Sequence, residues 1–333
     1  METLATPHNS IEPVLAQLLR LVADPAVTDV LVNGPAQVWV DRGSGLEAVA
    51  GLGVSGEARA GDSGAGVSGE QLVQVAFTLA QLADRHVDLA NPMGDFVLGL
   101  PQLPPLAGLG VESLRVHVVL QSAVSPETLI SLRVHRAGGL SLEQLVQSGF
   151  CSAVQAGQLA SLAAGSLNFL VAGPAGSGKT TLLRALLAQQ SELRTVVIED
   201  TAELLPIAGH AIGLQCRQAN TEGRGLVDAA ELLRQALRMR PDRLVVGEIR
   251  GTEVGVLLQA LNTGHRGSAA TLHANSAAAV PSRLLGLALQ AGIPESAFWL
   301  AAPVAFEYVV QLGRGGDGVR RVAEIQAWNE LVA

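Results

Sequence analysis

The chain has 333 residues, of which 48% are hydrophobic and 16% are charged, a composition typical of a globular protein with two domains. No apolar run approaches the 18 or so residues of a membrane-spanning helix, and the N-terminal segment METLATPHNSIEPV lacks the basic and apolar regions of a secretory signal. We therefore expect a cytoplasmic protein. The two cysteines, Cys151 and Cys216, are far apart and form no CxxC motif, which argues against a disulfide framework or a zinc site.

Charge is distributed unevenly along the chain. Residues 1–150 contain 7 arginines and 15 acidic residues, a balance of −8, whereas residues 151–333 contain 15 basic and 15 acidic residues and are neutral. An acidic half repels phosphate backbones, so we expect no direct contact with nucleic acid. Of the 22 basic residues 21 are arginine, and the single lysine is Lys179. This usage suggests a site that needs a compact ammonium group.

The first 138 residues are predicted to form a small α/β domain. In chain order the patterns indicate a helix over 11–23, two strands (VTDVLVNG and QVWVDR), a glycine-rich mobile loop over 51–69, a helix from Gly69, and a loop over 101–110. Two further strands, SLRVHVVLQ and ETLISLRVH, each have an arginine near the centre, Arg115 and Arg133. The capped helix in GGLSLEQLVQSG then begins a second domain over 139–333.

The second domain is predicted to contain a parallel sheet. The apolar strands LNFLVAG, RTVVIED, DRLVVGE and SAATLHA alternate with the helical segments TTLLRALLAQ, GLVDAAELLRQALRMR and TEVGVLLQALNTG. Such alternation is typical of α/β proteins, which have helices on both faces of the sheet. The last segments, APVAFEYVVQLG and GVRRVAEIQAW, are predicted to add an antiparallel pair at one edge.

A phosphate-binding loop is the strongest motif. The segment from Gly173 to Thr180 fits G-x-x-x-x-G-K-[ST] between a predicted strand and a predicted helix. Its glycines let successive N–H groups point at phosphate oxygens, and the helix N-terminus adds partial positive charge. Lys179 would reach the β- and γ-phosphates, and the Thr180 hydroxyl would ligate Mg²⁺. The candidate nucleotide-binding residues are Gly173, Pro174, Ala175, Gly176, Ser177, Gly178, Lys179, Thr180 and Thr181.

Acidic residues follow two of the predicted strands. Glu248 comes at the end of LVVGE, where ligands bind in open α/β sheets, and a carboxylate there can activate the attacking water. An exposed glutamate at the start of a loop is the structural alternative. Glu199 and Asp200 end the strand RTVVIED, where two acids can serve the site or simply cap the following segment.

His265 and His273 flank the segment RGSAATL. Each can be a structural histidine, and a zinc pair is disfavoured because further ligands are missing at metal spacing. The functional alternative is a sensor at a strand end that hydrogen-bonds the γ-phosphate.

Together these motifs resemble the secretion traffic ATPases, the motors of type II and type IV secretion, type IV pili and tight-adherence pili. The resemblance is carried by GPAGSGKTTLL, VVIEDTAEL, LRMRPDRLVVGEIRGTE and LLQALNTGHRGSAATLHAN, and it extends more loosely through DVLVNGPAQVWVD. It is greatest to the tight-adherence pilus and conjugal-transfer-associated branch. Residues 96–113 depart from the short turn that the family usually has before its first arginine.

The resemblance implies a hexameric ring ATPase that uses ATP and Mg²⁺, with an N-terminal α/β domain and a RecA-like P-loop motor domain. It implies that Glu248 is the catalytic glutamate, that Glu199 acts near Mg²⁺ and water, and that His273 is the histidine-box residue. It also implies that Arg115 and Arg133 reach the γ-phosphate; the alternative is that both are solvated strand arginines.

The function that we predict is ATP hydrolysis that powers assembly of a tight-adherence or type IV-like pilus, or type II secretion. The motor would act on an inner-membrane platform protein and would associate with the membrane only through its partners. Three alternatives remain: a conjugation or type IV secretion ATPase, a nucleotide-switched binding module with little turnover, and a small-molecule kinase. The kinase is disfavoured because the sequence has no recognisable lid or acceptor pocket between its motifs.

Overall fold

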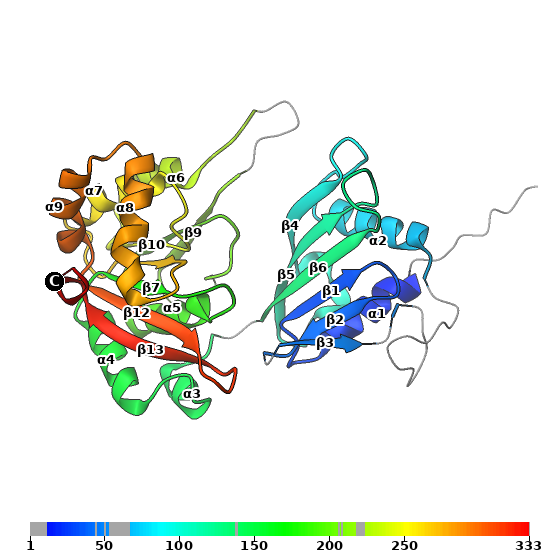
Figure 1. The fold of residues 1–333 in the computed structure, drawn as a ribbon, viewed down its shortest axis with the longest axis horizontal. Coiled ribbons are helices and arrows are strands. Elements are labelled where there is room, and N and C mark those ends of the chain that lie inside the picture. The colour runs from blue at the N-terminus through cyan, green and yellow to red at the C-terminus, as the bar shows by residue number, and fades with distance from the viewer. Residues whose placement is uncertain are drawn as a thin grey trace, which may run out of the picture. The chain divides into compact units, whose positions relative to one another are not determined.

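The computed structural model describes residues 12–332 except 44, 50, 53–66, 137–138, 206, 208 and 218–223. The chain forms two compact units, Met1–Gly138 and Gly139–Ala333, and each is described by itself (Figure 1). Most of the glycine-rich segment over 51–69 lies outside the described residues. On either side of residues 53–66, Leu52 and Val67 are buried, and the Val67 N–H donates to the Leu52 carbonyl over 3.2 Å.

The first unit is a six-stranded antiparallel sheet with two helices. The strand order is β3-β2-β1-β6-β5-β4. The strands are β1 (Asp29–Asn33), β2 (Val38–Asp41), β3 (Leu46–Val49), β4 (Met93–Gly99), β5 (Val111–Val119) and β6 (Leu129–Arg136). The helices are α1 (Glu12–Ala23) and α2 (Gly69–Leu82), and two short 3₁₀ turns follow β4, η1 (Leu100–Gln102) and η2 (Pro104–Leu106).

Both helices of this unit pack into one apolar core with the sheet. Leu18 of α1 and Leu72 of α2 are fully buried there with Val116 and Leu132 of the strands. Because side chains alternate along a strand, the intervening residues, including Arg115 and Arg133, lie on the opposite face. This arrangement leaves Arg115 of β5 and Arg133 of β6 outside the core.

The sequence patterns miss part of this unit. The strands β3 and β4 were not predicted, and the segment predicted as a loop over 101–110 contains η1 and η2 instead. Leu103 and Leu106 in these turns are 2% and 1% exposed. Prolines limit the segment to short turns, whereas the tertiary core determines that two of its leucines are buried.

The second unit is built on a seven-stranded sheet in the order β13-β12-β7-β11-β10-β8-β9. All neighbours are parallel except β12 and β13, which confirms the predicted parallel sheet with an antiparallel edge. The strands are β7 (Phe169–Ala172), β8 (Thr195–Glu199), β9 (Ala211–Gln215), β10 (Arg243–Val246), β11 (Ala269–Leu272), β12 (Tyr308–Arg314) and β13 (Arg320–Ala327).

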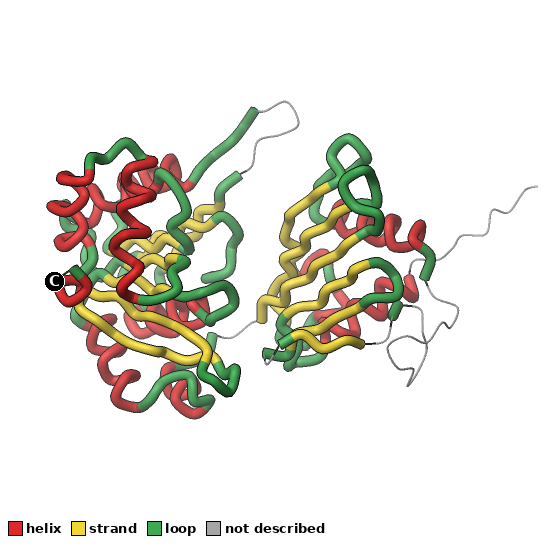
Figure 2. Tube along the Cα trace, in the orientation of Figure 1, coloured by secondary structure: helices red, strands yellow, loops and turns green. Residues whose placement is uncertain are grey.

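Helices cover both faces of this sheet (Figure 2). One face packs against α3 (Leu142–Gln147), α4 (Ala153–Ala164) and α5 (Lys179–Leu187), which η3 (Ala188–Gln190) extends. The other face packs against α6 (Ala229–Ala236), α7 (Glu253–Leu261), α8 (Val280–Gln290), α9 (Glu295–Ala305) and α10 (Trp328–Leu331), with η4 (Leu237–Met239) and η5 (Ala277–Ala279) between them. The central strands β7, β8, β10 and β11 are buried at every residue. Two burying faces explain why these strands are continuously apolar.

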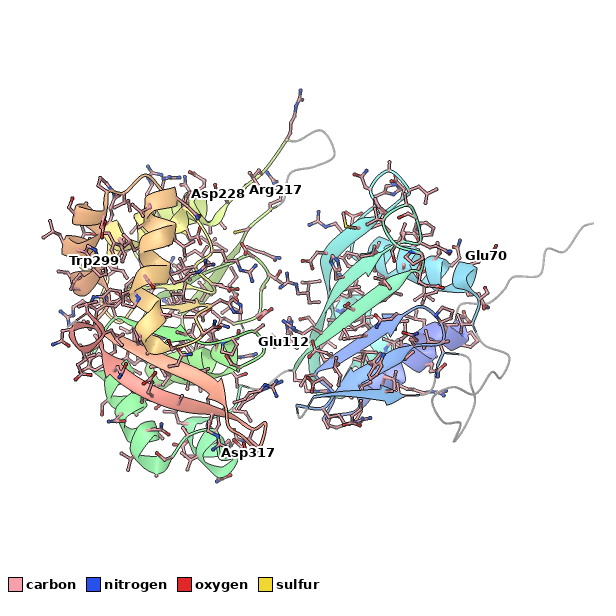
Figure 3. The ribbon with its side chains drawn as sticks, viewed as in Figure 1. Glu70, Glu112, Arg217, Asp228, Trp299 and Asp317 are labelled. Carbon is pink, nitrogen blue, oxygen red and sulfur yellow. The ribbon has the colours of Figure 1, made fainter. Side chains whose placement is uncertain are left out.

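The C-terminal part corrects one prediction. The strand predicted from Ala302 begins only at Tyr308, because α9 continues to Ala305 through Pro303. Ala302 and Ala305 are fully buried beside Phe298, so packing of the helix overrides the strand-like pattern. Neither α8 nor α9 was predicted. Figure 3 labels Trp299 on α9 and Asp228, whose side chain caps α6. Within the described part of the chain, no helix is both long and apolar enough to cross a membrane.

Candidate active site

The phosphate-loop motif lies between β7 and α5, in the local context that the sequence predicts. Gly176 and Gly178 have φ of +66° and +97°, a left-handed conformation that side chains disfavour. At Gly178 a Cβ atom would also lie 2.9 Å from Phe150 Cε2. Glycine is therefore required there both by the backbone and by a close neighbour.

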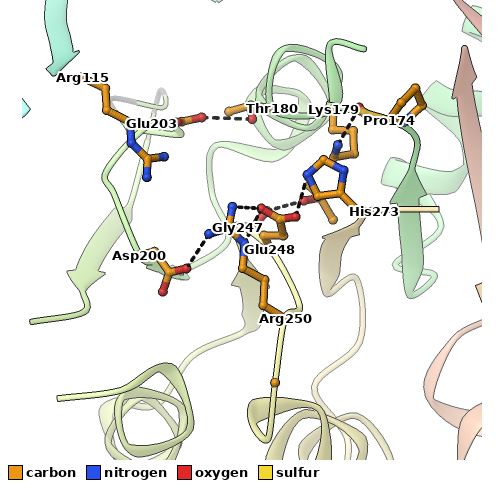
Figure 4. Close-up of polar contacts among 12 residues, drawn as sticks. Arg115, Pro174, Lys179, Thr180, Asp200, Glu203, Gly247, Glu248, Arg250 and His273 are labelled. Carbon is orange, nitrogen blue, oxygen red and sulfur yellow. Dashed lines mark hydrogen bonds and ion pairs between the residues drawn. The ribbon is translucent and has the colours of Figure 1, made fainter. Parts of the chain in front are cut away.

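The loop holds its lysine inward. The Lys179 side chain is buried, and its Nζ donates hydrogen bonds to the carbonyls of Gly173 and Pro174 over 2.9 and 3.0 Å (Figure 4). The crest of the loop, residues 174–176, is exposed. An ammonium group beside an exposed loop at the N-terminus of a helix is suited to bind a polyphosphate. Thr180 and Thr181 follow in the first turn of α5.

The Thr180 hydroxyl faces an acid that sequence reasoning missed. Its Oγ1 lies 3.4 Å from Glu203 Oε2 (Figure 4). A hydroxyl and a carboxylate are hard oxygen ligands of the kind that Mg²⁺ prefers, so this pair fits the ion that the phosphate loop implies. The signal was present in IEDTAEL, where Glu203 is the second glutamate, but its position near Thr180 depends on the turn after β8.

Glu199 is a buried residue beneath that turn. It is 7% exposed, and its carboxylate accepts hydrogen bonds from the main-chain N–H groups of Glu203 and Leu204 over 3.1 to 3.3 Å. Gly247 leaves room for it, because a Cβ there would lie 2.8 Å from Glu199 Cγ. Glu199 thus orients the turn that carries Glu203. Its predicted action near Mg²⁺ and water stays a prediction.

Burial also changes the acidity of this carboxyl. Desolvation raises the pKa of Glu199 from 4.5 to about 7, outweighing its two main-chain hydrogen bonds, which lower it. The folded state therefore keeps a proton that the unfolded chain releases between pH 4.5 and 7. Stability from this group is complete below pH 4.5 and is lost as the pH rises to about 7, with a total of about 3 kcal/mol.

We expect Glu199→Gln to remove this pH dependence. Relative to the natural chain, the free energy of unfolding of the variant should rise by up to about 3 kcal/mol between pH 4.5 and 8, because an amide does not ionise. Urea unfolding at several pH values measures the difference, with exposed Glu192→Gln as the control. If the free energy of unfolding of the natural chain and of Glu199→Gln changed with pH in parallel, the prediction that Glu199 keeps its proton in the folded state would be wrong.

Glu248 follows β10 and is engaged on both carboxylate oxygens. His273 Nε2 lies 2.9 Å from Oε1, and the Arg250 guanidinium contacts Oε2 through Nε at 2.7 Å and through a terminal nitrogen (Figure 4). Arg250 also contacts Asp200 Oδ2 over 3.2 Å. The Glu248 side chain is 16% exposed. The structure thus joins the ends of β8, β10 and β11 through side chains.

The two histidines have different environments. His273 follows β11 and contacts Glu248, and burial followed by the charge of Lys179 lowers its pKa, with Glu248 opposing. A neutral ring at neutral pH can donate through Nε2 to the carboxylate. His265 instead lies with Nδ1 3.0 Å from the Ala260 carbonyl near the end of α7, which fits the structural alternative.

Arg115 and Arg133 lie directly opposite each other on β5 and β6 of the first unit. Arg115 forms an ion pair with Asp95 over 2.8 Å, and Arg133 forms one with Asp29 over 3.0 Å. Flanking carboxylates offset the repulsion between two adjacent guanidinium groups. Their predicted contact with the γ-phosphate stays a prediction.

The fold and the site define an α/β protein with a phosphate loop at the C-terminal edge of a largely parallel sheet. The family described as "Type II/IV secretion system protein" matches residues 111–312, and the chain belongs to that family. It is 40% identical over 328 residues to the "Putative conjugal transfer protein" of Mycobacterium tuberculosis, covering 98% of this chain and 85% of the relative. It is 33% identical over 279 residues to the "Probable conjugal transfer protein TrbB" of Sinorhizobium fredii, covering 83% and 76%.

Two solved structures share the fold. The Legionella pneumophila ATPase DotB matches with a TM-score of 0.66 and 18% identity, over 96% of this chain and 82% of that one. The pilus retraction motor PilT with bound ADP matches with a TM-score of 0.63 and 20% identity, over 95% and 82%. These findings confirm the predicted secretion ATPase superfamily and the RecA-like motor fold. The relatives from Mycobacterium tuberculosis and Sinorhizobium fredii are both described as conjugal transfer proteins. Their descriptions favour the conjugation alternative over the pilus or type II prediction.

Proposed function

We propose that this chain is a Mg²⁺-dependent ATPase that powers conjugal transfer or a related type IV secretion process. The observation that carries the proposal is the meeting of Lys179, Thr180, Glu248 and His273 at one edge of the sheet. The names of the relatives support the kind of process. A nucleotide-switched module with little turnover is disfavoured by Glu248, which that role does not need.

Each side chain has a part in the proposed reaction. The loop N–H groups and Lys179 bind and neutralise the phosphates, and Glu248 orients the attacking water and draws its proton. His273 holds Glu248 on the side of the phosphate loop and can respond to the γ-phosphate. Thr180, with Glu203 nearby, would hold Mg²⁺, which supplies charge neutralisation to the transferring phosphoryl group.

The partners are also proposed from the family. The motor is a homohexamer at the cytoplasmic face of the inner membrane, where it acts on membrane components of the secretion system. The acidic balance of residues 1–150 argues that the chain moves a nucleoprotein cargo without binding its nucleic acid directly.

Steady-state phosphate release with Mg·ATP tests the enzymatic part of the proposal. Turnover that EDTA abolishes is expected, and its absence at every protein concentration and with lipid added would support the switch module. Deleting the gene tests the process: we expect loss of DNA or protein transfer to a recipient. A strain that transfers normally but lacks pili would instead support the tight-adherence prediction.

The first unit supplies a further prediction. If Arg133 stabilises charge on the transferring phosphoryl group, Arg133→Ala should lower kcat by about 10³-fold and change nucleotide affinity much less. Phosphate release and nucleotide titration measure the two effects. The control is Arg20→Ala, an exposed arginine on α1. Full activity of Arg133→Ala would show instead that Arg133 is a solvated strand arginine that does not contribute to hydrolysis.

A further inference from the structure

Arg250 joins two acids that follow different strands. Its guanidinium contacts Glu248 Oε2 through two nitrogens and Asp200 Oδ2 through the third (Figure 4). Asp200 follows β8 and Glu248 follows β10, the adjacent strand in the sheet. A planar guanidinium can serve two carboxylates at once, whereas an ammonium group is a single point charge.

The main chain that carries Arg250 is fixed from both sides. The Ile249 N–H donates to the Thr271 carbonyl of β11 over 2.9 Å, and the Thr271 hydroxyl donates to the Gly247 carbonyl. On the other side, Glu253 in the first turn of α7 accepts from the N–H groups of Arg250 and Gly251. Glu253 is 7% exposed. Arg250 therefore projects from a fixed segment although its own side chain is 53% exposed.

This geometry limits how the Glu248 carboxylate can turn. His273 contacts Oε1 and Arg250 contacts Oε2, so the carboxylate is held between two donors. Asp200 in turn holds the far end of the guanidinium, 3.2 Å away. A carboxylate that orients water is effective only near its productive geometry, and a displacement of about 1 Å can cost about 10²-fold in rate.

We propose that Arg250, anchored by Asp200, is a positioning residue that sets the orientation of the Glu248 carboxylate for hydrolysis. The inference rests on the proposed ATPase function. It assigns Asp200 a role that acts on Glu248 through Arg250. In the sequence, Arg250 is the arginine of GEIRG, and Asp200 is the aspartate of VVIED.

Mutant kinetics test whether Asp200 acts through Arg250 on the Glu248 carboxylate. We expect Arg250→Gln to lower kcat by about 10- to 100-fold with the KM for ATP within about twofold, because the phosphate loop is untouched. Asp200→Asn should lower kcat by about 3- to 10-fold. The double variant should be no slower than Arg250→Gln, since Asp200 acts through the arginine. Arg250→Gln should also add no loss to Glu248→Gln in single-turnover measurements.

The chain offers a matched control. Arg42 in the first unit also bridges two carboxylates, Asp24 over 3.0 Å and Glu47 over 2.9 Å, so Arg42→Gln removes a similar bridge outside the motor unit. We expect it to keep the natural kcat. Thermal melts check that every variant is folded. Arg250→Lys keeps the positive charge but lacks the planar guanidinium group, so it should recover only part of the kcat that Arg250→Gln loses.

Several outcomes would overturn the proposed positioning role of Arg250 and Asp200. These are a natural kcat for Arg250→Gln, a raised KM with kcat kept, multiplicative losses in the double variant with Asp200→Asn, or a further loss on top of Glu248→Gln. If the natural chain itself shows no Mg²⁺-dependent turnover, the proposed function fails instead, so the two failures are distinguishable.

Discussion

Lys179→Ala is expected to abolish ATP turnover, with a loss of at least about 10³-fold in kcat/KM. Lys179 is the only lysine in the protein, and its ammonium group is held inward by hydrogen bonds to the carbonyls of Gly173 and Pro174. No other lysine can take over its charge at the transferring phosphoryl group. Alanine suits a helix start, so α5 should remain folded.

Phosphate release and calorimetry with Mg·ATP measure this loss. We expect little or no heat of association for Lys179→Ala, and Lys179→Arg should remain strongly impaired because its broader head group does not fit the same loop. The single lysine allows a second check, since a lysine-selective reagent that labels the natural chain should be blocked by bound nucleotide. Turnover by Lys179→Ala near the natural rate would refute the phosphate-loop assignment.

Glu248→Gln is expected to lower kcat by about 10²- to 10⁴-fold while nucleotide binding is kept. The amide keeps the shape of the side chain, and its oxygen can still accept from Arg250, but it cannot draw a proton from water. The expected pattern is therefore loss of kcat with an affinity for Mg·ATP that is natural or tighter.

A comparison with Glu192→Gln, an exposed glutamate of the same unit, controls for the general effect of removing one negative charge. Single-turnover measurements separate the chemical step from product release. Natural turnover by Glu248→Gln would show that another group readies the water. Loss of binding with an intact kcat would instead assign Glu248 to the nucleotide pocket.

Local sequence was sufficient for the parts of the site that one segment builds. The phosphate loop is contiguous, so strand, glycines, lysine and helix start are legible from Gly173 to Thr180. The parallel sheet was also predictable, because strands buried on both faces give continuous apolar runs. Predictions were wrong where packing overrides pattern, as at Ala302 and Ala305, which extend α9 into a predicted strand.

The chemical groups of the site are legible in the sequence: a loop for phosphates, one lysine, and acids at the ends of apolar strands. The partner of each acid, by contrast, depends on how the chain folds in three dimensions. Glu199 and Glu203 are four residues apart, yet one is buried under a turn and the other faces Thr180. Arg250 bridges two acids, Asp200 and Glu248, that are 48 residues apart in the chain. Such pairings depend on which strands are neighbours in the sheet, and strand order is set by the packing of the whole domain and not by local sequence.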